Sequence, residues 1–538
     1  MQAIIYQETT SLNDEKVLTL DTDNRTNSHQ KKKYMMHKYW GKKPSNELSE
    51  IISKFSISGD LLLDPLAGYG GFSSEAVLSG RNVISNDLNP IANFINHCLL
   101  MVDVDLDKLI SYYETVNERI RDCEEFWYSY KENTNDEKII TTLRDRGGKA
   151  LKLKVARDKN VIEKDMSAES QLNLENKEKN YKINEWYPKN KLISNSRISS
   201  KKGMTVDQLF DVRSLACHAK LYYEVNDLPN SNEKDLLLLA FTSNLANCSK
   251  LVPPIKSRGE MSQGAWMTGF YIGDRYLENN VFHYYRNRFS KILAGKHEYI
   301  TQYYDMFHKG AYKITNNDAK SLEIEDESID LVFTDFPYGD AVPYFEQSSI
   351  WNAWMRFDVD YDNEIIISDS KERDKGHTQY KSDITKAINE IYRVLKTNKH
   401  FIFSYHSLSG IEWSSITSAL LKAGFVIEDC QMIAQKTFTP RQLNRTKTIK
   451  GDLILICKKC KSKPRYTPTV SLQDEENFVN SLFIQTLKAG VYYTNDIIIY
   501  FLKLFFDSRV VVSNMNIISN LEKIADFDGK GWVLSENI

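Results

Sequence analysis

The sequence predicts an α/β fold in which helices cover a mostly parallel sheet of seven strands. Short apolar runs of strand length alternate with helical stretches in two separate parts of the chain. The first strand leads through a glycine-rich turn into a helix and then a second strand, and such crossovers join parallel strands. With 41% hydrophobic and 26% charged residues among 538, the composition excludes a disordered or fibrous chain.

The first part of the alternation lies near the N-terminal end. An apolar strand over residues 60–64 ends at an acid, and a turn with three glycines follows at residues 67–71. A helix over residues 72–79 then leads to a strand over 83–85, which ends at Asp87. This order predicts a strand–turn–helix–strand unit.

The second part of the alternation covers residues 312–457. Between its strands, residues 383–395 place apolar side chains at helical spacing. The expected strands of this part cover residues 312–314, 331–334, 401–405, 425–428 and 453–456. One sheet can contain both parts, because the entropy of closing a long loop grows only with the logarithm of its length.

The intervening residues, about 103–293, break the pattern. Residues 131–182 are rich in Lys, Glu and Asn and predict charged helices or a partly mobile insertion, whereas residues 235–248 predict a buried helix. After Pro464 the chain predicts a separate unit, with helices over residues 475–488, 494–506 and 514–524 and a hairpin around Gly529. Helices followed by a terminal hairpin suggest a small winged-helix-like module.

Charge and residue usage exclude several classes of protein. Seventy basic residues against 72 acidic ones give a net charge of −2, so any contact with nucleic acid must come from local patches. No apolar run approaches the roughly 18 residues of a membrane span, and residues 1–33 lack a signal peptide's apolar segment, so we expect a soluble cytoplasmic protein. The seven cysteines predict free thiols, and Cys457 and Cys460 lack the further ligands that zinc needs, so no metal site is expected.

The residues around the first turn indicate a nucleoside ligand. The segment Asp64-Pro65-Leu66-Ala67-Gly68-Tyr69-Gly70-Gly71 ends a strand, and its glycines allow backbone amides to approach a ligand closely. Asp87 follows sixteen residues after Gly71, at the end of the next strand, where a carboxylate can accept both ribose hydroxyls. The spacing differs from the dinucleotide fingerprint, which argues against a pyrophosphate ligand. For the glycines alone, a tight turn without any ligand is the alternative.

A second set of polar groups, Thr334-Asp335-Phe336-Pro337-Tyr338, follows the strand over residues 329–333. The Asp335 carboxylate and the Phe336 carbonyl could accept the hydrogens of an exocyclic amine, which would free the amine's lone pair. The ring of Tyr338 offers a stacking face for a base extruded from a duplex. Alternatively, the motif caps a strand end and Asp335 bonds neighbouring amides.

Together the two patterns resemble the S-adenosylmethionine-dependent amino-methyltransferases of DNA, the N6-adenine and N4-cytosine group. The family's cofactor motif, Asp-Pro-Phe-x-Gly-x-Gly, corresponds to residues 64–70, and its catalytic motif, Asp/Asn/Ser-Pro-Pro-Tyr, corresponds to residues 335–338. Phe336 stands where the family has its first catalytic proline, and Leu66 and Gly71 replace the more usual Phe and Thr. The resemblance implies a Rossmann-like class I methyltransferase fold with S-adenosylmethionine as cofactor. The acidic first catalytic residue implies adenine N6 as acceptor.

Further segments extend the resemblance over about residues 34–125 and 183–460. Residues 37–44 look like the lid over the cofactor's methionine end, residues 86–90 like the ribose motif, and residues 317–319 like the motif whose acid reaches the cofactor's adenine. Residues 339–344 continue the catalytic loop as in a subset of bacterial restriction-modification and phage-defence methylases. The resemblance implies catalytic roles for Asp335, Phe336, Pro337 and Tyr338. It implies cofactor contacts for Lys43, Pro44, Asp64, Pro65, Ala67, Gly68, Gly70, Asp87, Leu88, Asn89, Asp318, Ala319 and Asp335.

The order of the motifs implies a domain plan: a polar extension (1–33), the cofactor-binding half of the methyltransferase core (34–125), an inserted region for target recognition (126–294), the catalytic half (295–462) and the C-terminal module (463–538). Within the insert, Trp186 and Tyr187 adjoin a run of cations without an acid. Such a run suits contact with the phosphates of double-stranded DNA, with an aromatic wedge, or else is a solvated loop. The expected nucleic-acid-binding residues are Lys189, Lys191, Arg197, Lys201, Lys202 and Tyr338.

The sequence thus predicts a site-specific DNA methyltransferase that modifies adenine N6 by direct displacement on a flipped base. Two alternatives stay open at this point. One is an RNA methyltransferase that acts on guanine N2. The other, which Phe336 keeps open, is a catalytically silent component that binds cofactor and DNA in a defence complex with partner proteins.

Overall fold

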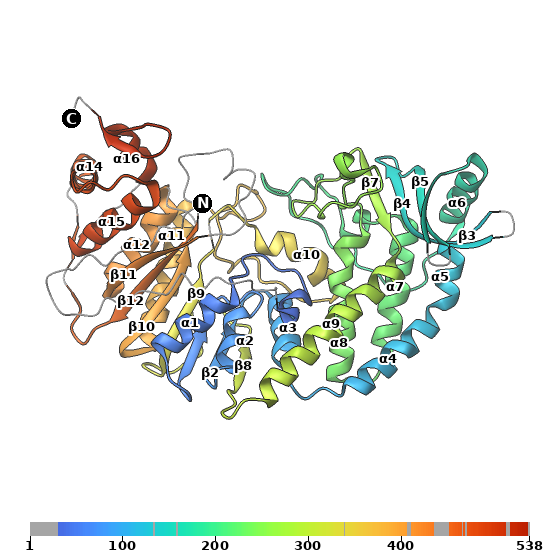
Figure 1. Ribbon diagram of the computed structural model, residues 1–538, viewed down its shortest axis with the longest axis horizontal. Helices are drawn as coiled ribbons and strands as arrows, with labels where there is room; N and C mark the ends of the chain where they lie inside the picture. The colour runs from blue at the N-terminus through green and yellow to red at the C-terminus, as the bar shows by residue number, and fades with distance from the viewer. Residues whose placement is uncertain are drawn as a thin grey trace.

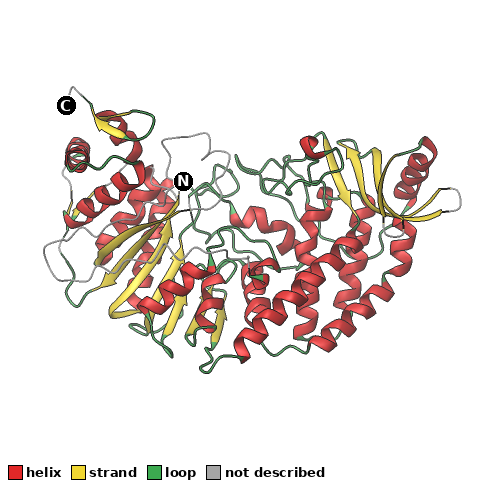
Figure 2. Cartoon of the chain, viewed as in Figure 1, coloured by secondary structure: helices red, strands yellow, loops and turns green. Residues whose placement is uncertain are grey.

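The structure is a computed structural model in which a central sheet lies at one end of the molecule and a largely helical insert at the other (Figure 1). It describes residues 31–132, 135–157, 160–337, 339–405, 410–434, 451–464, 466–468, 471–512 and 517–535. Helices flank the central sheet, and the insert combines long helices with a smaller sheet (Figure 2). Within the described part, no helix is both long and apolar enough to cross a membrane.

Seven strands form the central sheet, in the order β11-β12-β10-β9-β1-β2-β8. They are β1 (Leu61–Asp64), β2 (Asn82–Asn86), β8 (Tyr312–Thr315), β9 (Ile329–Asp335), β10 (Leu395–Tyr405), β11 (Phe425–Ala434) and β12 (Gly451–Lys459). The five strands from β8 to β10 pair in parallel, whereas β12 runs antiparallel to both of its neighbours. Each of the seven strands expected from the sequence is present, and the α/β class is confirmed.

Side chains alternate between the two faces of this sheet. In β9, Leu331 and Phe333 pack on one face with α1 (Ser45–Phe55) and α2 (Gly71–Val77), while Val332 packs on the other. The second face is covered by α11 (His377–Val394) and α12 (Gly410–Ala423). Both faces are therefore buried, as is usual for a mainly parallel sheet.

The strand order reverses beside β1. The chain moves outward from β1 through β2 to β8 and then returns to β9 on the other side of β1. In open α/β sheets, ligands bind beyond the carboxyl ends of the strands at such a switch point. Asp64 ends β1, Asp87 follows β2 and Asp335 ends β9, so the topology brings these three acids to one edge.

Among the described residues, the insert between the two halves of the sheet contains six α-helices, three short 3-10 helices and five strands. The α-helices are α4 (Leu106–Arg119), α5 (Arg121–Tyr128), α6 (Ala168–Asn180), α7 (Val212–Asn226), α8 (Asn232–Leu245) and α9 (Val281–Tyr304). The strands are β3 (Ser129–Glu132), β4 (Asn135–Asp145), β5 (Ala150–Arg157), β6 (Asn160–Asp165) and β7 (Arg275–Asn279). One buried cluster joins the insert to α3 (Pro90–Leu100) and α10 (Tyr344–Trp354), which flank the cavity described below.

The prediction of charged helices or a mobile insertion over residues 131–182 is wrong for most of that range. Antiparallel strands occupy the range up to residue 165, and α6 is the only helix among the described residues of this range. In β5, Leu153 and Val155 are buried and alternate with the half-buried Lys152 and Lys154. This period of two is that of an amphipathic strand, which the many lysines obscured. The buried helix expected over residues 235–248 is present as α8 and the short helix η3 (Ala246–Cys248).

The C-terminal residues contain the expected helices and hairpin. The elements are β13 (Thr467–Pro468), α14 (Leu472–Lys488), α15 (Thr494–Asp507), β14 (Val510–Val511), α16 (Ile517–Ile524), β15 (Ala525–Phe527) and β16 (Trp532–Leu534). Residues 514–516 of the third predicted helix lie outside the described residues. Phe501 and Trp532 share one buried cluster with Trp413 of α12, and the Ser418 hydroxyl donates to the carbonyl of Val512 at 3.0 Å. These elements therefore extend the core of the sheet, which differs from the separate packing unit predicted.

Candidate active site

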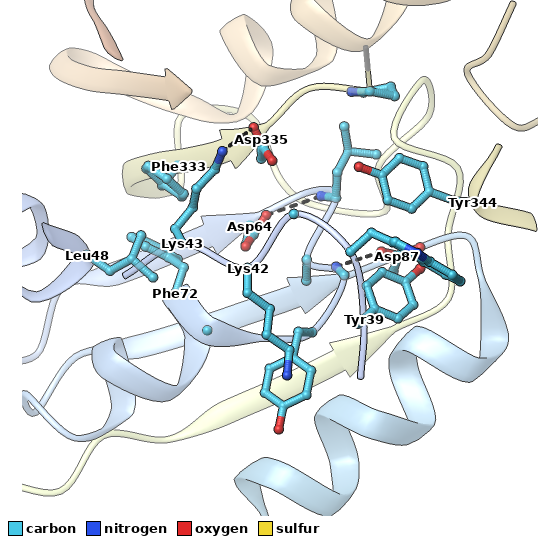
Figure 3. Close-up of a pocket in the computed structure, with 18 of the residues that line it drawn as sticks. Tyr39, Lys42, Lys43, Leu48, Asp64, Phe72, Asp87, Phe333, Asp335 and Tyr344 are labelled. Atoms are coloured by element: carbon cyan, nitrogen blue, oxygen red, sulfur yellow. Dashed lines mark hydrogen bonds and ion pairs between the residues drawn. The ribbon is translucent and has the colours of Figure 1, made fainter. Parts of the chain in front are cut away.

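A cavity of about 370 Å³ lies at the switch point of the sheet. Its lining comes from the ends of β1, β2 and β9, from the turn after β1, and from N-terminal residues within 31–48. Figure 3 shows Asp64, Asp87 and Asp335 around the cavity, with Lys43 reaching toward Asp335. Small-molecule sites occupy roughly 300–1,000 Å³, so the cavity has the size of a ligand site.

The glycine-rich turn forms one wall of the cavity and is held by Asp87. The N–H of Gly68 donates to Oδ2 of Asp87 at 2.8 Å, and the N–H of Asn89 donates to Oδ1 at 2.8 Å. Gly68 has a φ of +51°, and a Cβ there would lie 3.2 Å from the ring of Tyr39. At Gly70, with a φ of +83°, a Cβ would lie 1.9 Å from Oδ1 of Asn96. The turn therefore requires both glycines, which keep its backbone close to the cavity.

Two of the three acids at this edge bind protons more tightly than usual. Burial raises the pKa of Asp87 to about 6, although the amides of Asn89 and Gly68 act in the opposite direction. Burial also raises the pKa of Asp64 well above its usual range, and the charges of Asp87 and Asp335 add to this effect. A positively charged ligand among these carboxylates would be stabilised by them.

Asp335, at the end of β9, is held from two sides. The Ser404 hydroxyl of β10 donates to its Oδ1 at 2.6 Å, and Nζ of Lys43 lies 3.2 Å from the same oxygen. Lys43 Nζ also donates to Oδ2 of Asp452 in β12 at 2.8 Å. The Asp335 side chain lines the cavity and is 17% exposed, so a ligand can reach it.

The loop after Asp335 is anchored to the sheet and to α11. The ring of Phe336 is fully buried and packs edge-on against Phe401 and Phe403, so its side chain points away from the cavity. Pro337 lines the cavity, and its carbonyl accepts a hydrogen bond from the Tyr380 hydroxyl at 2.9 Å. Tyr338, the predicted stacking residue, lies outside the described residues.

Asp318, Ala319 and Glu364 contribute another part of the lining. Oδ1 of Asp318 accepts from the N–H of Lys320 at 2.9 Å, which fixes the carboxylate in a turn. Burial raises the pKa of Glu364 to about 8; the charge of Glu346 adds to the rise and Arg373 opposes it. This lining therefore offers one acid that is half-exposed and one that is buried.

The structure places most of the predicted cofactor residues in the cavity wall: Lys43, Pro44, Asp64, Ala67, Gly68, Asp87, Leu88, Asp318, Ala319 and Asp335. Pro65, Gly70 and Asn89 are not part of this wall. Asn89 is buried instead, and its Nδ2 donates to the Tyr39 hydroxyl at 3.2 Å and to the Ser348 hydroxyl at 2.9 Å. It therefore ties α10 and the N-terminal residues 31–48 that line the cavity, called the cavity cover below, to the end of β2.

Several residues in the wall were not predicted. Tyr39 and Tyr344 contribute rings that stack with centroids 6.2 Å apart, and Phe345 and Glu364 lie beside them in the lining. Both tyrosines fall within segments that the sequence analysis singled out, at residues 37–44 and 339–344. Glu364 has no local signal, because only the packing of its loop against α10 brings it to the cavity.

The predicted DNA-contacting lysines, Lys189, Lys191, Lys201 and Lys202, are exposed on the insert. Arg197 is also exposed, but its Nη2 lies 2.7 Å from Oδ2 of Asp340, and its Nε donates to the Asp340 carbonyl at 3.1 Å. The basic stretch of the insert thus contacts the loop that continues from Asp335.

The ring of Trp186, expected as an aromatic wedge, is 40% exposed and packs against neighbours over part of its surface. The ring of Trp186 packs against Tyr222 and Trp354, with centroids 5.6 and 6.1 Å away, and the guanidinium of Arg356 lies 3.8 Å from its centroid. Trp186 therefore belongs to the packed surface of the insert.

All seven cysteines lie within the described part of the chain and are free thiols, as predicted. Among the described residues, no group of three or more His, Cys, Asp or Glu side chains is placed to hold a metal ion.

No family model matches this sequence. Among solved structures, an S-adenosylmethionine-dependent methyltransferase from Methanosarcina mazei shares 12% identity over 31% of this chain and 77% of its own, with a TM-score of 0.18. A Thermus thermophilus protein, provisionally named a DNA modification methylase and complexed with S-adenosyl-L-methionine, shares 12% identity over 32% of this chain and 61% of its own, with a TM-score of 0.17. An rRNA methyltransferase from Streptomyces viridochromogenes shares 9% identity over 78% of this chain and 85% of its own, with a TM-score of 0.22. At this level of similarity, the activity has to be inferred from the cavity itself.

Proposed function

We propose that this protein transfers a methyl group from S-adenosylmethionine to an exocyclic amine of DNA, with adenine N6 as the acceptor. One observation carries the proposal. The glycine-rich turn held by Asp87 and the strand end that carries Asp335 line the same cavity, although they are far apart in the sequence. The turn expected to bind the cofactor's nucleoside and the carboxylate expected to accept a hydrogen from the substrate amine are thereby brought together, which is the arrangement that methyl transfer requires.

The cavity suits S-adenosylmethionine in both size and charge. This cofactor supplies an electrophilic methyl group on a positively charged sulfur. Asp87 is positioned to accept the ribose hydroxyls, because its oxygens already face the turn and the start of α3. Asp318 and Glu364 are the candidates for the adenine, and the aromatic rings of Tyr39 and Tyr344 offer apolar faces. The acids of the lining favour a cation over a pyrophosphate.

The protein's task in the reaction is to present the amine with its lone pair free. The ionised carboxylate of Asp335 accepts a hydrogen from the amine, and it takes the proton that the nitrogen releases once the methyl group is attached. The Phe336 carbonyl is the proposed second acceptor. The family's proline would stiffen this loop, and here the buried ring of Phe336 anchors it instead. We assign base stacking to Tyr338.

We assign target recognition to the insert. Its exposed lysines at positions 189, 191, 201 and 202 suit a phosphate backbone. The pair between Arg197 and Asp340 connects this surface to the loop that follows Asp335, so a duplex on the insert would lie next to the acceptor site. The exposed lysines and the contact between Arg197 and Asp340 thus support recognition beside the cavity, with DNA as the substrate.

Transfer of tritiated methyl groups tests the proposal. The protein is incubated with labelled S-adenosylmethionine and either duplex DNA or transfer RNA, and the product nucleosides are separated. We expect label in N6-methyl-2′-deoxyadenosine from DNA. Label in N2-methylguanosine from RNA would overturn the substrate assignment, and no label in either would overturn the activity.

The variant Asp335→Ala tests the catalytic assignment. It should lose transfer by at least about 100-fold, because general acid–base partners typically contribute 10²–10⁴-fold. Its affinity for S-adenosylmethionine in calorimetry should change little. Asp358→Ala, an exposed acid on a neighbouring loop, serves as the matched control and should transfer at the wild-type rate. Transfer by Asp335→Ala at the wild-type rate would contradict the mechanism.

A further inference from the structure

Lys43 lies between two carboxylates that belong to different strands. Its Nζ is 3.2 Å from Oδ1 of Asp335 on β9 and 2.8 Å from Oδ2 of Asp452 on β12. The three side chains are 13%, 17% and 14% exposed, so solvent screens the contacts only in part. Lys43 itself belongs to the N-terminal segment that covers the cavity (Figure 3).

Among the described residues, the groups that face Asp335 include two sets with opposite effects. The Ser404 hydroxyl and Lys43 favour its ionised form by hydrogen bonding and by charge. Asp452 opposes it because it competes for the same ammonium group. Asp64, whose own pKa is raised by burial and by the charge of Asp335, opposes it only when ionised. Burial raises the pKa of the Tyr344 and Tyr405 hydroxyls, and the negative charge of Asp335 adds to the rise. Both hydroxyls therefore stay neutral and bring no charge to Asp335.

The energetic balance makes Lys43 decisive. Burial disfavours its charge, yet Asp335 and Asp452 more than compensate and raise the pKa of Lys43 above its usual value. By reciprocity, the ammonium group favours the ionised state of both acids. Without it, Asp335 would stand among like charges in a partly buried site, and a proton on its carboxyl would remove the acceptor that the amine needs.

We propose that Lys43 is a positioning residue that keeps Asp335 ionised and aimed at the acceptor amine, and that Asp452 limits this effect by sharing Lys43. The inference rests on the proposed function and adds two residues to it. Because Lys43 lies on the cavity cover, the ion pair also links the position of the cover to the ionisation state of Asp335. The cover thereby has a role in the transfer step besides enclosing the cofactor.

Opposite effects of two variants test this inference. Lys43→Met removes the stabilising cation, so the pH at which the transfer rate falls to half on the acid side should rise by about 1 to 3 units. Asp452→Asn removes the competing acid, so the same midpoint should fall. Lys43→Arg should keep it close to wild type. A purely structural role would lower all rates without moving the midpoints apart.

A second readout does not depend on transfer. In protein labelled with ¹³C at aspartate carboxyls, the Asp335 resonance is assigned by its loss in Asp335→Asn, and its titration midpoint is followed in wild type and in both variants. Midpoints that move up in Lys43→Met and down in Asp452→Asn support the inference. Unchanged midpoints, or shifts in the same direction, overturn it. If the wild-type protein transfers no methyl group, the proposed function fails, while the titration still decides the pairing of Lys43.

Discussion

The affinity for S-adenosylmethionine should depend on pH through Asp87. Its carboxylate lines the cavity and is the proposed acceptor of the ribose hydroxyls, a role that the ionised form performs best. Burial raises the pKa of this carboxyl to about 6, so it loses its charge within an accessible pH range. Affinity should therefore be full above pH 7 and weaken as the pH falls through 6.

The size of the effect follows from the ionised fraction. With a pKa of about 6, that fraction is about 0.97 at pH 7.5 and about 0.09 at pH 5. When only the ionised form binds, the apparent dissociation constant scales with the inverse of this fraction, so it should rise about 10-fold between these two pH values. Glu364, whose pKa is raised to about 8, is almost fully protonated from pH 5 to 7 and only about a quarter ionised at pH 7.5, so it adds little to this change.

Isothermal titration calorimetry from pH 5 to 7.5 measures this dependence, and Asp87→Asn is the matched control. The Asp87→Asn variant should bind S-adenosylmethionine about 10- to 100-fold more weakly than the wild type at pH 7.5, since a charge-assisted hydrogen bond contributes about 1.5–3 kcal/mol. Its affinity should also be nearly independent of pH over this range. A wild-type affinity that stays flat from pH 5 to 7.5, or a variant that keeps the slope, would show that Asp87 does not hold the ligand.

Two further changes probe the fold around the cavity and in the insert. Gly70→Ala should lower the melting temperature and abolish cofactor binding, because its Cβ would lie 1.9 Å from Oδ1 of Asn96. Gly59→Ala is the control: Gly59 has a similar positive φ but open space around it, so the variant should lose only about 1–2 kcal/mol of stability. Equal melting temperatures of the two variants in differential scanning fluorimetry would contradict this reasoning. Glu278→Ala should destabilise the insert by about 3–5 kcal/mol, because it leaves the buried Arg144 and Arg213 without the acid that joins them. Limited proteolysis measures this effect, and cleavage of the insert at the wild-type rate would contradict the role of Glu278.

The parts of the fold that could be predicted have local causes. Strands such as β9 are short apolar runs bounded by turns, so hydrophobicity alone marks them. The turn at residues 67–71 needs glycine at Gly68 and Gly70 for its positive φ values, and this need leaves a visible motif. Acids at strand ends could be placed at one edge from the topology of a parallel sheet. In each case, the residues that predict the feature lie next to it in the sequence.

The remainder of the site depends on contacts between distant segments. Glu364 reaches the cavity from a loop, and Asp452 meets Lys43 only because β12 lies beside β10 in the sheet. Glu364 carries no pattern in its own neighbourhood, and nothing local to Asp452 predicts its contact with Lys43. The strands of the insert were missed for a different reason: lysines on β5 alternate with the buried Leu153 and Val155, so average polarity hid a regular period.

The cover of the cavity is held by the protein itself and not only by a ligand. Nζ of Lys42 donates to the carbonyls of Tyr34 and His37 at 2.8 and 2.6 Å and lies 3.5 Å from the ring centroid of Tyr69 in the glycine-rich turn. Burial lowers the pKa of Lys42 to about 7, and the charge of Lys38 adds to this effect. The neutral amine still has N–H groups that can donate to the two carbonyls. A cover fastened in this way leaves the cavity preformed, and little ordering free energy is then lost when a ligand binds. The same fastening places Lys43, the next residue, within reach of Asp335, so the sequence of the cover serves enclosure and chemistry together.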